Sequence, residues 1–201
     1  MATVCVSCGE YVETAVDREK SLRKCPTCHH EEAIRLLPLF IVTGASGVGK
    51  TTTVKHLRPL LENCDVFDTD EMKAESWEQA RSNWLKVAFQ IAQSGRCTVL
   101  CGTMMPWDVE ACDHYRFFRH VYYLNLHCGD DARAERLRSR PSWRNTSEAF
   151  IEEHRSFAGW LLDHAATDFD PPMPVVDSTA RPVEETAGQI RDWVNRWRAL
   201  H

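Results

Sequence analysis

Short apolar runs alternate with amphipathic stretches along most of the chain. Apolar runs bounded by turn residues predict buried strands, and apolar residues three or four positions apart predict helices. The runs expected to form strands are residues 36–42, 65–68, 97–101, 121–126 and 175–177. Because strands that alternate with helices build a mostly parallel sheet, the pattern predicts an α/β fold with a five-stranded parallel sheet flanked by helices.

Helices are expected between and after these strands, at about residues 50–62, 71–95, 130–140, 145–164 and 182–197. Pro59 should bend or shorten the first of them. Asn145, with Glu148 three positions later, is typical of a helix start. Pro182 is expected to open the last helix, since proline is favoured at the first helical position.

A phosphate-binding loop follows the first strand. Residues 44–51 match the pattern G-x-x-x-x-G-K-[ST], in which glycines let backbone N–H groups curl around phosphate oxygens. Lys50 would then reach the β- and γ-phosphates, and the Thr51 hydroxyl would bind Mg²⁺. The segment predicts a nucleoside triphosphate site formed by Gly44, Ala45, Ser46, Gly47, Val48, Gly49, Lys50, Thr51 and Thr52.

Two carboxylates follow the second strand, at the sheet edge where ligands bind in α/β folds. Beside a triphosphate, one carboxylate can hold Mg²⁺ and the other can accept a proton from an attacking hydroxyl. We predict Asp68 as the metal-side residue and Asp70 as the base or orienting residue, with the reverse assignment left open. The alternative is an Asx turn that caps the next helix. The third strand ends in Gly102 and Thr103 without a carboxylate, which favours the metal role of the pair.

A cluster of arginines follows the fourth strand and predicts a lid over the phosphates. Arg136 and Arg140 lie four positions apart, so we expect them to share one helical face. Arg133 and Arg138 are expected to form a solvated face balanced by acidic neighbours. Arg144 extends the cluster beyond the predicted helix.

The predicted helix 71–95 carries an aromatic stripe that is expected to lie mostly in the core. Trp77, Arg81 and Trp84 fall in the segment that would cover an acceptor. The alternative is therefore an aromatic wall with one guanidinium beside an acceptor pocket.

The first 35 residues contain two cysteine pairs with the spacing C-x2-C-x16-C-x2-C. Each pair can present two thiolates to one tetrahedral Zn²⁺. A segment this short cannot bury a stabilising core alone, so metal binding would supply its folding energy. The pattern predicts a zinc ribbon over residues 1–35 and a second domain over residues 36–201, with Cys5, Cys8, Cys25 and Cys28 as the zinc ligands.

The role of this ribbon is open at the level of sequence. Its basic residues could bind nucleic acid, but acidic neighbours dilute their charge, so a structural, dimerising or substrate-covering role is favoured. His29 and His30 are expected to lie outside the ligand set. The basic residues in question are Arg18, Lys20, Arg23 and Lys24.

Composition narrows the class of protein. A net charge of −5 argues against general binding to nucleic acid or membranes. The sequence has no apolar run of transmembrane length and no recognisable signal peptide. Nine cysteines are best explained by a metal site plus buried thiols in a reducing compartment, so we expect a cytoplasmic protein.

These motifs, in this order, resemble those of small P-loop kinases of the adenylate kinase-like group. The resemblance covers about residues 36–200. Within the group the chain looks most like adenylylsulfate kinase, gluconate kinase, chloramphenicol phosphotransferase and polynucleotide kinase, which phosphorylate hydroxyls. It rests on residues 44–51, Asp68-Thr69-Asp70, Gly102-Thr103, residues 134–140 and Asp177-Ser178-Thr179.

The resemblance implies ATP and Mg²⁺ as cofactors and assigns roles by position. Asp70 would lie at the acceptor, Arg136 near the adenine, and Arg140 near the phosphates. The base would lie beside Ser178, Thr179 and Pro182. The short lid and the lack of an arginine cluster in residues 71–95 favour a hydroxyl acceptor over a nucleoside monophosphate.

The sequence therefore predicts a kinase that phosphorylates a hydroxyl of a nucleoside, sugar or antibiotic-like molecule, with Lys50, Asp68, Asp70 and Arg140 as catalytic residues. One alternative is a nucleoside monophosphate kinase or a nucleic-acid 5′-hydroxyl kinase that uses the ribbon to hold the strand. Another is an adaptor ATPase in which the nucleotide switches a ribbon-mediated interaction. The oligomeric state is not predicted.

Overall fold

A parallel sheet forms the centre of the molecule. In the computed structural model, which describes residues 2–200, its five strands are β6 (Leu39–Thr43), β7 (Cys64–Asp68), β8 (Cys97–Cys101), β9 (Val121–His127) and β10 (Val175–Asp177). They lie in the order β10-β9-β6-β8-β7, and every neighbouring pair is parallel. All residues of the central strand β6 are buried, which explains its continuous apolar run. The predicted α/β fold is confirmed.

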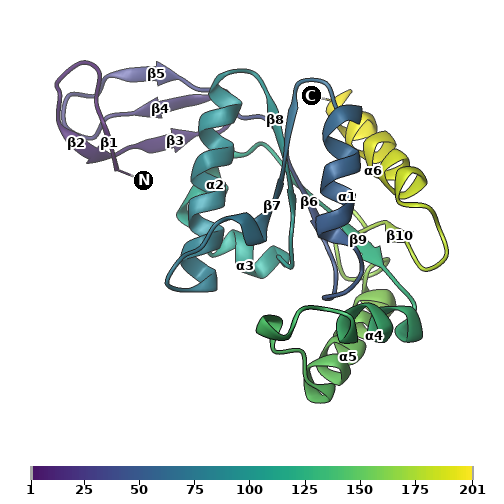
Figure 1. The fold of residues 1–201 in the computed structure, drawn as a ribbon. Helices are drawn as coiled ribbons and strands as arrows, with labels where there is room; N and C mark the ends of the chain where they lie inside the picture. Colours follow the sequence, from purple (N-terminus) through teal and green to yellow (C-terminus); the bar gives the residue numbers. More distant parts are fainter. Residues whose placement is uncertain (1, 201) are drawn as a thin grey trace.

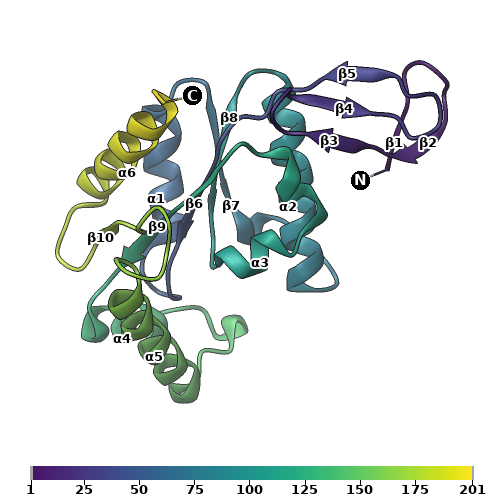
Figure 2. The same cartoon turned by 180° about the vertical axis from the view of Figure 1, so that it is seen from behind.

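Helices cover both faces of the sheet and its carboxyl edge (Figure 1, Figure 2). They are α1 (Lys50–Leu57), α2 (Trp77–Gln93), α3 (Pro106–Glu110), α4 (Asp130–Arg138), α5 (Glu148–His164) and α6 (Val183–Arg198). Short 3₁₀ turns are η1 (Arg58–Leu60), η2 (Thr69–Glu71), η3 (Asp113–Phe117) and η4 (Ser142–Arg144). Within residues 2–200, no helix is both long and apolar enough to cross a bilayer.

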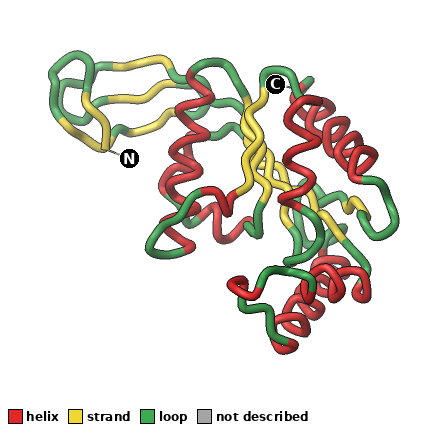
Figure 3. Tube along the Cα trace, in the orientation of Figure 1, coloured by secondary structure: helices red, strands yellow, loops and turns green. Residues whose placement is uncertain are grey.

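A hydrophobic core lies between each face of the sheet and the helices that cover it. Figure 3 shows helices on either side of the strands, with α1 and α6 on one face and α2 and α3 on the other. Alternate residues of β6 enter the two cores, as a pleated strand requires. Phe40 and Val42 pack with α1 and α6, whereas Leu39 and Ile41 pack with α2. α4 and α5 lie beyond the carboxyl ends of the strands.

Helix boundaries follow the capping residues. α1 ends before η1, which contains Pro59, so the predicted shortening is confirmed. α2 begins at Trp77, later than the predicted start at residue 71, because the Ser76 hydroxyl accepts the N–H of Gln79 and caps the helix there.

The predicted start of the fourth helix at Asn145 is wrong. Ser147 caps α5, and its hydroxyl accepts the N–H of Phe150 at 3.1 Å. Asn145 instead adopts a left-handed φ of +48° and ends η4. Serine and asparagine are both favoured caps, so residue type alone does not favour Asn145 over Ser147.

The N-terminal residues form a separate set of short antiparallel strands. β1 (Ala2–Val4) pairs with β2 (Tyr11–Glu13), and β3 (Ala15–Asp17), β4 (Leu22–Lys24) and β5 (Glu31–Ala33) form a second small sheet. This ribbon lies beside α2 at the amino ends of the parallel strands (Figure 1). Arg18 fixes it there, since its guanidinium donates to the carbonyls of Phe118 and Arg119, both at 2.7 Å.

Candidate active site

The phosphate-binding loop connects β6 to α1 and is anchored by its own side chains. Ala45 and Val48 are each 1% exposed, so both lie in the core. Gly44 has φ +144°, and a Cβ there would lie 2.3 Å from the carbonyl oxygen of Leu126, so only glycine fits. Gly49 has φ +98° and precedes the first residue of α1. A loop held in this way presents its backbone amides to an anion at the helix N-terminus.

Lys50 is the cationic centre of the site. Its ammonium donates to the carbonyls of Gly44 at 2.7 Å and Ala45 at 2.9 Å. Burial lowers the pKa of Lys50 to about 8, opposed by the nearby carboxylates of Asp70 and Asp68, while Arg140 adds to the lowering. The charges of Asp68, Asp70 and Arg140, the other three predicted catalytic residues, thus all reach Lys50.

The two predicted carboxylates have different surroundings. Asp68 is 5% exposed at the end of β7, and its Oδ1 accepts the N–H of Asp70 at 3.0 Å. The Asx turn considered as an alternative is therefore present, and it also positions Asp70. The Asp70 side chain is 46% exposed and pairs with Arg144 at 3.1 Å.

The turn that carries these carboxylates is held by two neighbours. The indole N–H of Trp84 donates to the carbonyl of Thr69 at 3.0 Å. A Cβ on Gly102 would lie 1.8 Å from Oγ1 of Thr69, so this glycine lets the end of β8 approach the turn closely. Thr103, the residue after this glycine, donates its hydroxyl to the Gly44 carbonyl at 2.9 Å.

The aromatic wall considered as an alternative for the acceptor pocket does not form as one surface. Trp84 is 5% exposed and packs in the core, in agreement with the expected core stripe. Arg81 pairs with Asp108 at 3.2 Å, and Trp77 is largely exposed at the start of α2. The alternative role for this stripe is therefore not supported.

The lid arginines take different positions. Arg136 lies on α4 and donates to the carbonyl of Ser178 at 3.1 Å. The helix ends at Arg138, and Arg140 lies in the turn that follows, where its N–H bonds to the carbonyl of Leu137. The expectation that Arg136 and Arg140 share a helical face is therefore wrong, because the helix is too short. Burial, with Arg144, lowers the pKa of Arg140 against the opposing effect of Asp70.

Arg133 corrects a second expectation. We predicted a solvated side chain, but it is 1% exposed, pairs with Asp130, and donates to the carbonyl of Cys128 at 2.8 Å. A Cβ on Gly47 would lie 2.9 Å from Cγ of Arg133, so this side chain packs directly against the phosphate-binding loop. The prediction holds for Arg138, which is exposed.

The loop after β10 is tied to the phosphate-binding loop. The Ser178 hydroxyl lies 2.8 Å from the carbonyl of Val48 and 2.9 Å from that of His127. Thr179 accepts the N–H of Gly129 at 2.8 Å through its hydroxyl. Pro182 is exposed and immediately precedes α6. The residues expected beside the base thus lie next to the residues expected to bind phosphate.

Thr51 and Thr52, the last two residues of the predicted triphosphate site, are exposed in the first turn of α1.

One residue of the site has no sequence signal. His154 lies on α5, and its Nδ1 accepts the N–H of Ser46 at 3.2 Å. Nothing in the pattern of α5 distinguishes this histidine from the others on amphipathic stretches. It was missed because its partner is a backbone amide far away in the sequence.

The lid turn also encloses an open polar hollow of about 620 Å³. No residue of the phosphate-binding loop is among those that line it. Its walls are Arg138, Arg140, Pro141, Ser142, Asn145, Thr146 and Ser147.

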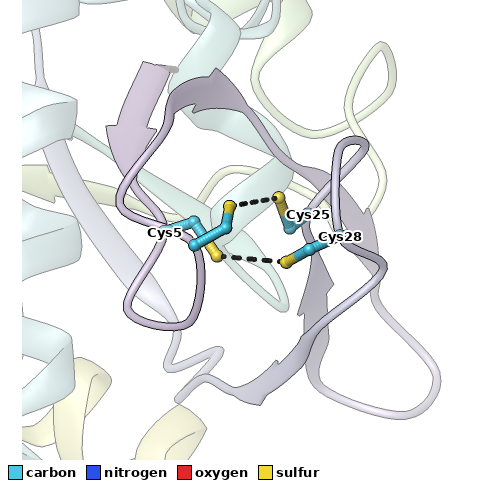
Figure 4. Close-up of side chains that lie close together, drawn as sticks. Cys5, Cys25 and Cys28 are labelled. Carbon is cyan, nitrogen blue, oxygen red and sulfur yellow. Dashed lines mark hydrogen bonds between the residues drawn. The ribbon is translucent and has the colours of Figure 1, made fainter.

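The four cysteines of the ribbon converge on one point, and Figure 4 shows Cys5, Cys25 and Cys28 turned toward one another. The four Sγ atoms, including that of Cys8, lie within 4.8 Å of one another. The Cys5–Cys28 and Cys8–Cys25 distances are 3.6 and 3.9 Å. Tetrahedral Zn–S bonds of about 2.3 Å would separate the sulfurs by about 3.8 Å, so the cluster fits zinc. Among residues 2–200, the metal-ligand cluster contains neither His29 nor His30, as expected.

Backbone N–H groups favour the thiolate form of Cys25. The N–H of Cys28, together with that of Thr27, lowers the pKa of the Cys25 thiol to about 6. The other cysteines of residues 2–200 are buried free thiols, in agreement with the prediction: Cys64, Cys97, Cys101, Cys112 and Cys128.

Neither the models of protein families nor the curated protein sequences match the chain. Solved structures do. A sugar kinase from Janibacter sp. shares 14% sequence identity at a TM-score of 0.55, over 81% of this chain and 97% of that one. A gluconokinase from Sinorhizobium meliloti shares 15% at 0.54, over 82% and 95%. Shikimate kinase from Acinetobacter baumannii, in complex with shikimate, shares 16% at 0.51, over 81% and 95%. The chain therefore has the fold of P-loop kinases, as the motifs predicted.

Proposed function

We propose that the chain is an ATP- and Mg²⁺-dependent phosphotransferase that moves the γ-phosphoryl group to a hydroxyl of a small molecule, such as a nucleoside, a sugar or an antibiotic-like compound. One observation carries the proposal: the Lys50 ammonium, at the start of α1, lies close enough to Asp68, Asp70 and Arg140 for their charges to shift its pKa. The sugar kinase, gluconokinase and shikimate kinase that share the fold support a small hydroxyl-bearing acceptor.

The donor side is formed by residues 44–52 and the loop after β10. Loop amides and Lys50 would hold the β- and γ-phosphates. Ser178, Thr179, Pro182 and Arg136 would lie beside the nucleoside. The Thr51 hydroxyl and the Asp68 carboxylate are oxygen donors of the kind that Mg²⁺ prefers. The ion would neutralise charge on the phosphates when bound there.

On the acceptor side, Asp70 would orient the hydroxyl and accept its proton, because this carboxylate is half exposed while Asp68 is buried. Lys50 and Arg140 would stabilise the charge that develops on the transferred group. The unequal exposure of the two carboxylates supports this division over the reverse one.

We assign the ribbon one Zn²⁺ and a structural role, and we place the activity in the cytoplasm, where thiolates stay reduced and ATP is abundant. The ribbon lies at the amino edge of the sheet, opposite the phosphate-binding loop, so a substrate-covering role is disfavoured. The four basic residues singled out in it all have partners, which weakens the case for nucleic acid. These pairs are Arg18 with the Phe118 carbonyl, Lys20 with Asp17, Arg23 with Glu32, and Lys24 with Glu31.

An acceptor screen with γ-labelled ATP tests the proposal. The panel contains sugars, nucleosides, hydroxylated antibiotics, nucleoside monophosphates and 5′-hydroxyl oligonucleotides. We expect labelled product from a small hydroxyl compound with the wild-type protein and none with Lys50→Met, which removes the charge at the transferred phosphate.

The remaining outcomes identify the alternatives. Label on a nucleoside monophosphate would identify a nucleoside monophosphate kinase. Label on an oligonucleotide would identify a 5′-hydroxyl kinase, and oligonucleotide binding should then weaken as salt is added. Hydrolysis of ATP without transfer to any compound, together with a nucleotide-dependent protein partner, would indicate an adaptor ATPase. Failure to bind ATP would contradict the whole proposal.

A further inference from the structure

His154 lies where a phosphate oxygen would be expected. Its Nδ1 accepts the N–H of Ser46, the third residue of the phosphate-binding loop, at 3.2 Å. Amides of such loops are the donors that bind phosphate oxygens. A phosphate that takes this N–H therefore replaces the imidazole as its acceptor.

The ring stays beside the loop when that exchange occurs. His154 is half-buried on α5, and its ring packs against that of Phe150, with the ring centres 4.3 Å apart. The ring centre of Phe157, on the next turn of the helix, lies 6.4 Å from that of His154. These contacts limit how far the imidazole can turn, so it would face the incoming phosphate.

Burial and the charges around His154 favour its neutral ring. Burial lowers the pKa of His154, and Lys50 lowers it further, against the opposing effect of Glu153 on the same helix. Arg140, from the turn after α4, and Arg133, from α4, add to the lowering. A neutral ring is consistent with Nδ1 as a hydrogen-bond acceptor. A polyphosphate bound here would raise the pKa of His154, because its negative charge offsets the three cations.

We propose that His154 is a phosphate contact of the nucleotide site, which accepts the Ser46 N–H before the nucleotide binds and then takes up a proton and donates to a phosphate oxygen. This inference rests on the proposed function only in requiring a nucleotide at the loop. Ligand binding that favours the protonated ring is tighter at lower pH. The phosphate itself titrates near pH 6, so the informative quantity is the difference between wild-type and variant proteins.

Calorimetry with the β,γ-imido analogue of ATP and Mg²⁺, in two buffers of different protonation enthalpy, counts the protons taken up. The test variant is His154→Asn, which keeps a short acceptor for the Ser46 N–H but cannot be protonated. The matched control is His164→Asn on the same helix, where the ring stacks on Trp160. We expect His154→Asn to take up fewer protons than the wild type and to bind about tenfold more weakly at pH 6, with a smaller gap at pH 8.

Equal proton uptake and equal affinity in the wild type and His154→Asn would overturn the inference. So would tighter binding by the variant, because the ring would then only obstruct the loop. NMR titration of the His154 ring in the wild-type protein needs no variant. A pKa that rises when the analogue binds supports the proposal, and one that does not change overturns it. If the wild type binds no analogue, both this inference and the proposed function fail.

Discussion

Arg144 and Asp70 join η4, in the turn after α4, to η2 at the carboxyl edge of the sheet. Nη1 of Arg144 lies 3.1 Å from Oδ2 of Asp70, and the guanidinium lies over the ring of Trp143, 4.6 Å from its centre. Both charged side chains are partly exposed, so the pair itself should contribute only about 0–1 kcal/mol to stability. Its importance lies in position, because the lid turn reaches the carboxylate that would receive the proton.

Arg144→Gln should therefore affect turnover more than folding. We expect kcat to fall about 10–100-fold, because the lid turn no longer places its charge beside Asp70. The free energy of unfolding, measured in urea, should change by less than about 1 kcal/mol. Arg138→Gln is the matched control, since this arginine pairs with Glu148 on the outer side of the lid. A similar loss of kcat in both variants would show that the lid needs only positive charge.

Asp70→Asn should lose turnover and keep the nucleotide. An amide cannot accept the proton of the acceptor hydroxyl, so kcat should fall by about 10²–10⁴ with little change in the affinity for ATP. The control is Glu71→Gln, which removes the neighbouring carboxylate that pairs with Arg58. Full turnover by Asp70→Asn on the identified acceptor would remove Asp70 from the mechanism.

Removing zinc should unfold the ribbon and spare the chemistry. One zinc per chain is expected by elemental analysis, and a strong chelator at low pH or Cys25→Ser should release it. The melting temperature should fall, because the ribbon is bonded to the core through Arg18. The rate of phosphoryl transfer at low temperature should stay within about twofold of the untreated protein, since the site lies at the opposite edge of the sheet. Loss of transfer with the fold of the core intact would mean that the ribbon takes part in the reaction.

Gly102→Ala should be destabilising even though the residue is small. The added Cβ would lie 1.8 Å from Oγ1 of Thr69, so the turn that carries the carboxylates must move. A cost of about 1–3 kcal/mol in unfolding free energy is expected from this overpacking, together with a fall in kcat. At Gly159 in α5, a Cβ meets nothing within 4 Å. Gly159→Ala should therefore stabilise by about 0.5–1 kcal/mol. The same sign of change in both variants would contradict this explanation.

The fold could be predicted from the sequence because buried parallel strands and glycine-rich loops have strong local sequence patterns. The apolar run of β6 and the loop after it need no distant partner to be recognised. Helix starts were less certain, since Asn145 and Ser147 are both good caps and only the packed structure selects Ser147. Local signals set the type of element more firmly than its ends.

The candidate site was predictable where its residues belong to a motif and not where they act through tertiary contacts. Lys50, Asp68 and Asp70 follow strand ends and were found in this way. His154 contacts the loop through one backbone amide, and Arg133 is buried beneath Gly47. An arginine next to acidic residues normally suggests solvent exposure, so the burial of Arg133 depends on how α4 docks under the loop.

The hydroxyl of Ser178 lies against carbonyls of both the phosphate-binding loop and β9, and its own carbonyl accepts from Arg136. The two ends of the proposed nucleotide site are therefore held together by the same hydrogen bonds. A nucleoside that displaces the loop after β10 would also displace the backbone that cradles its phosphates. A base that fits poorly would then misalign the reacting phosphate and slow its transfer. The protein would discriminate among bases in this way without any contact between the base and the catalytic residues.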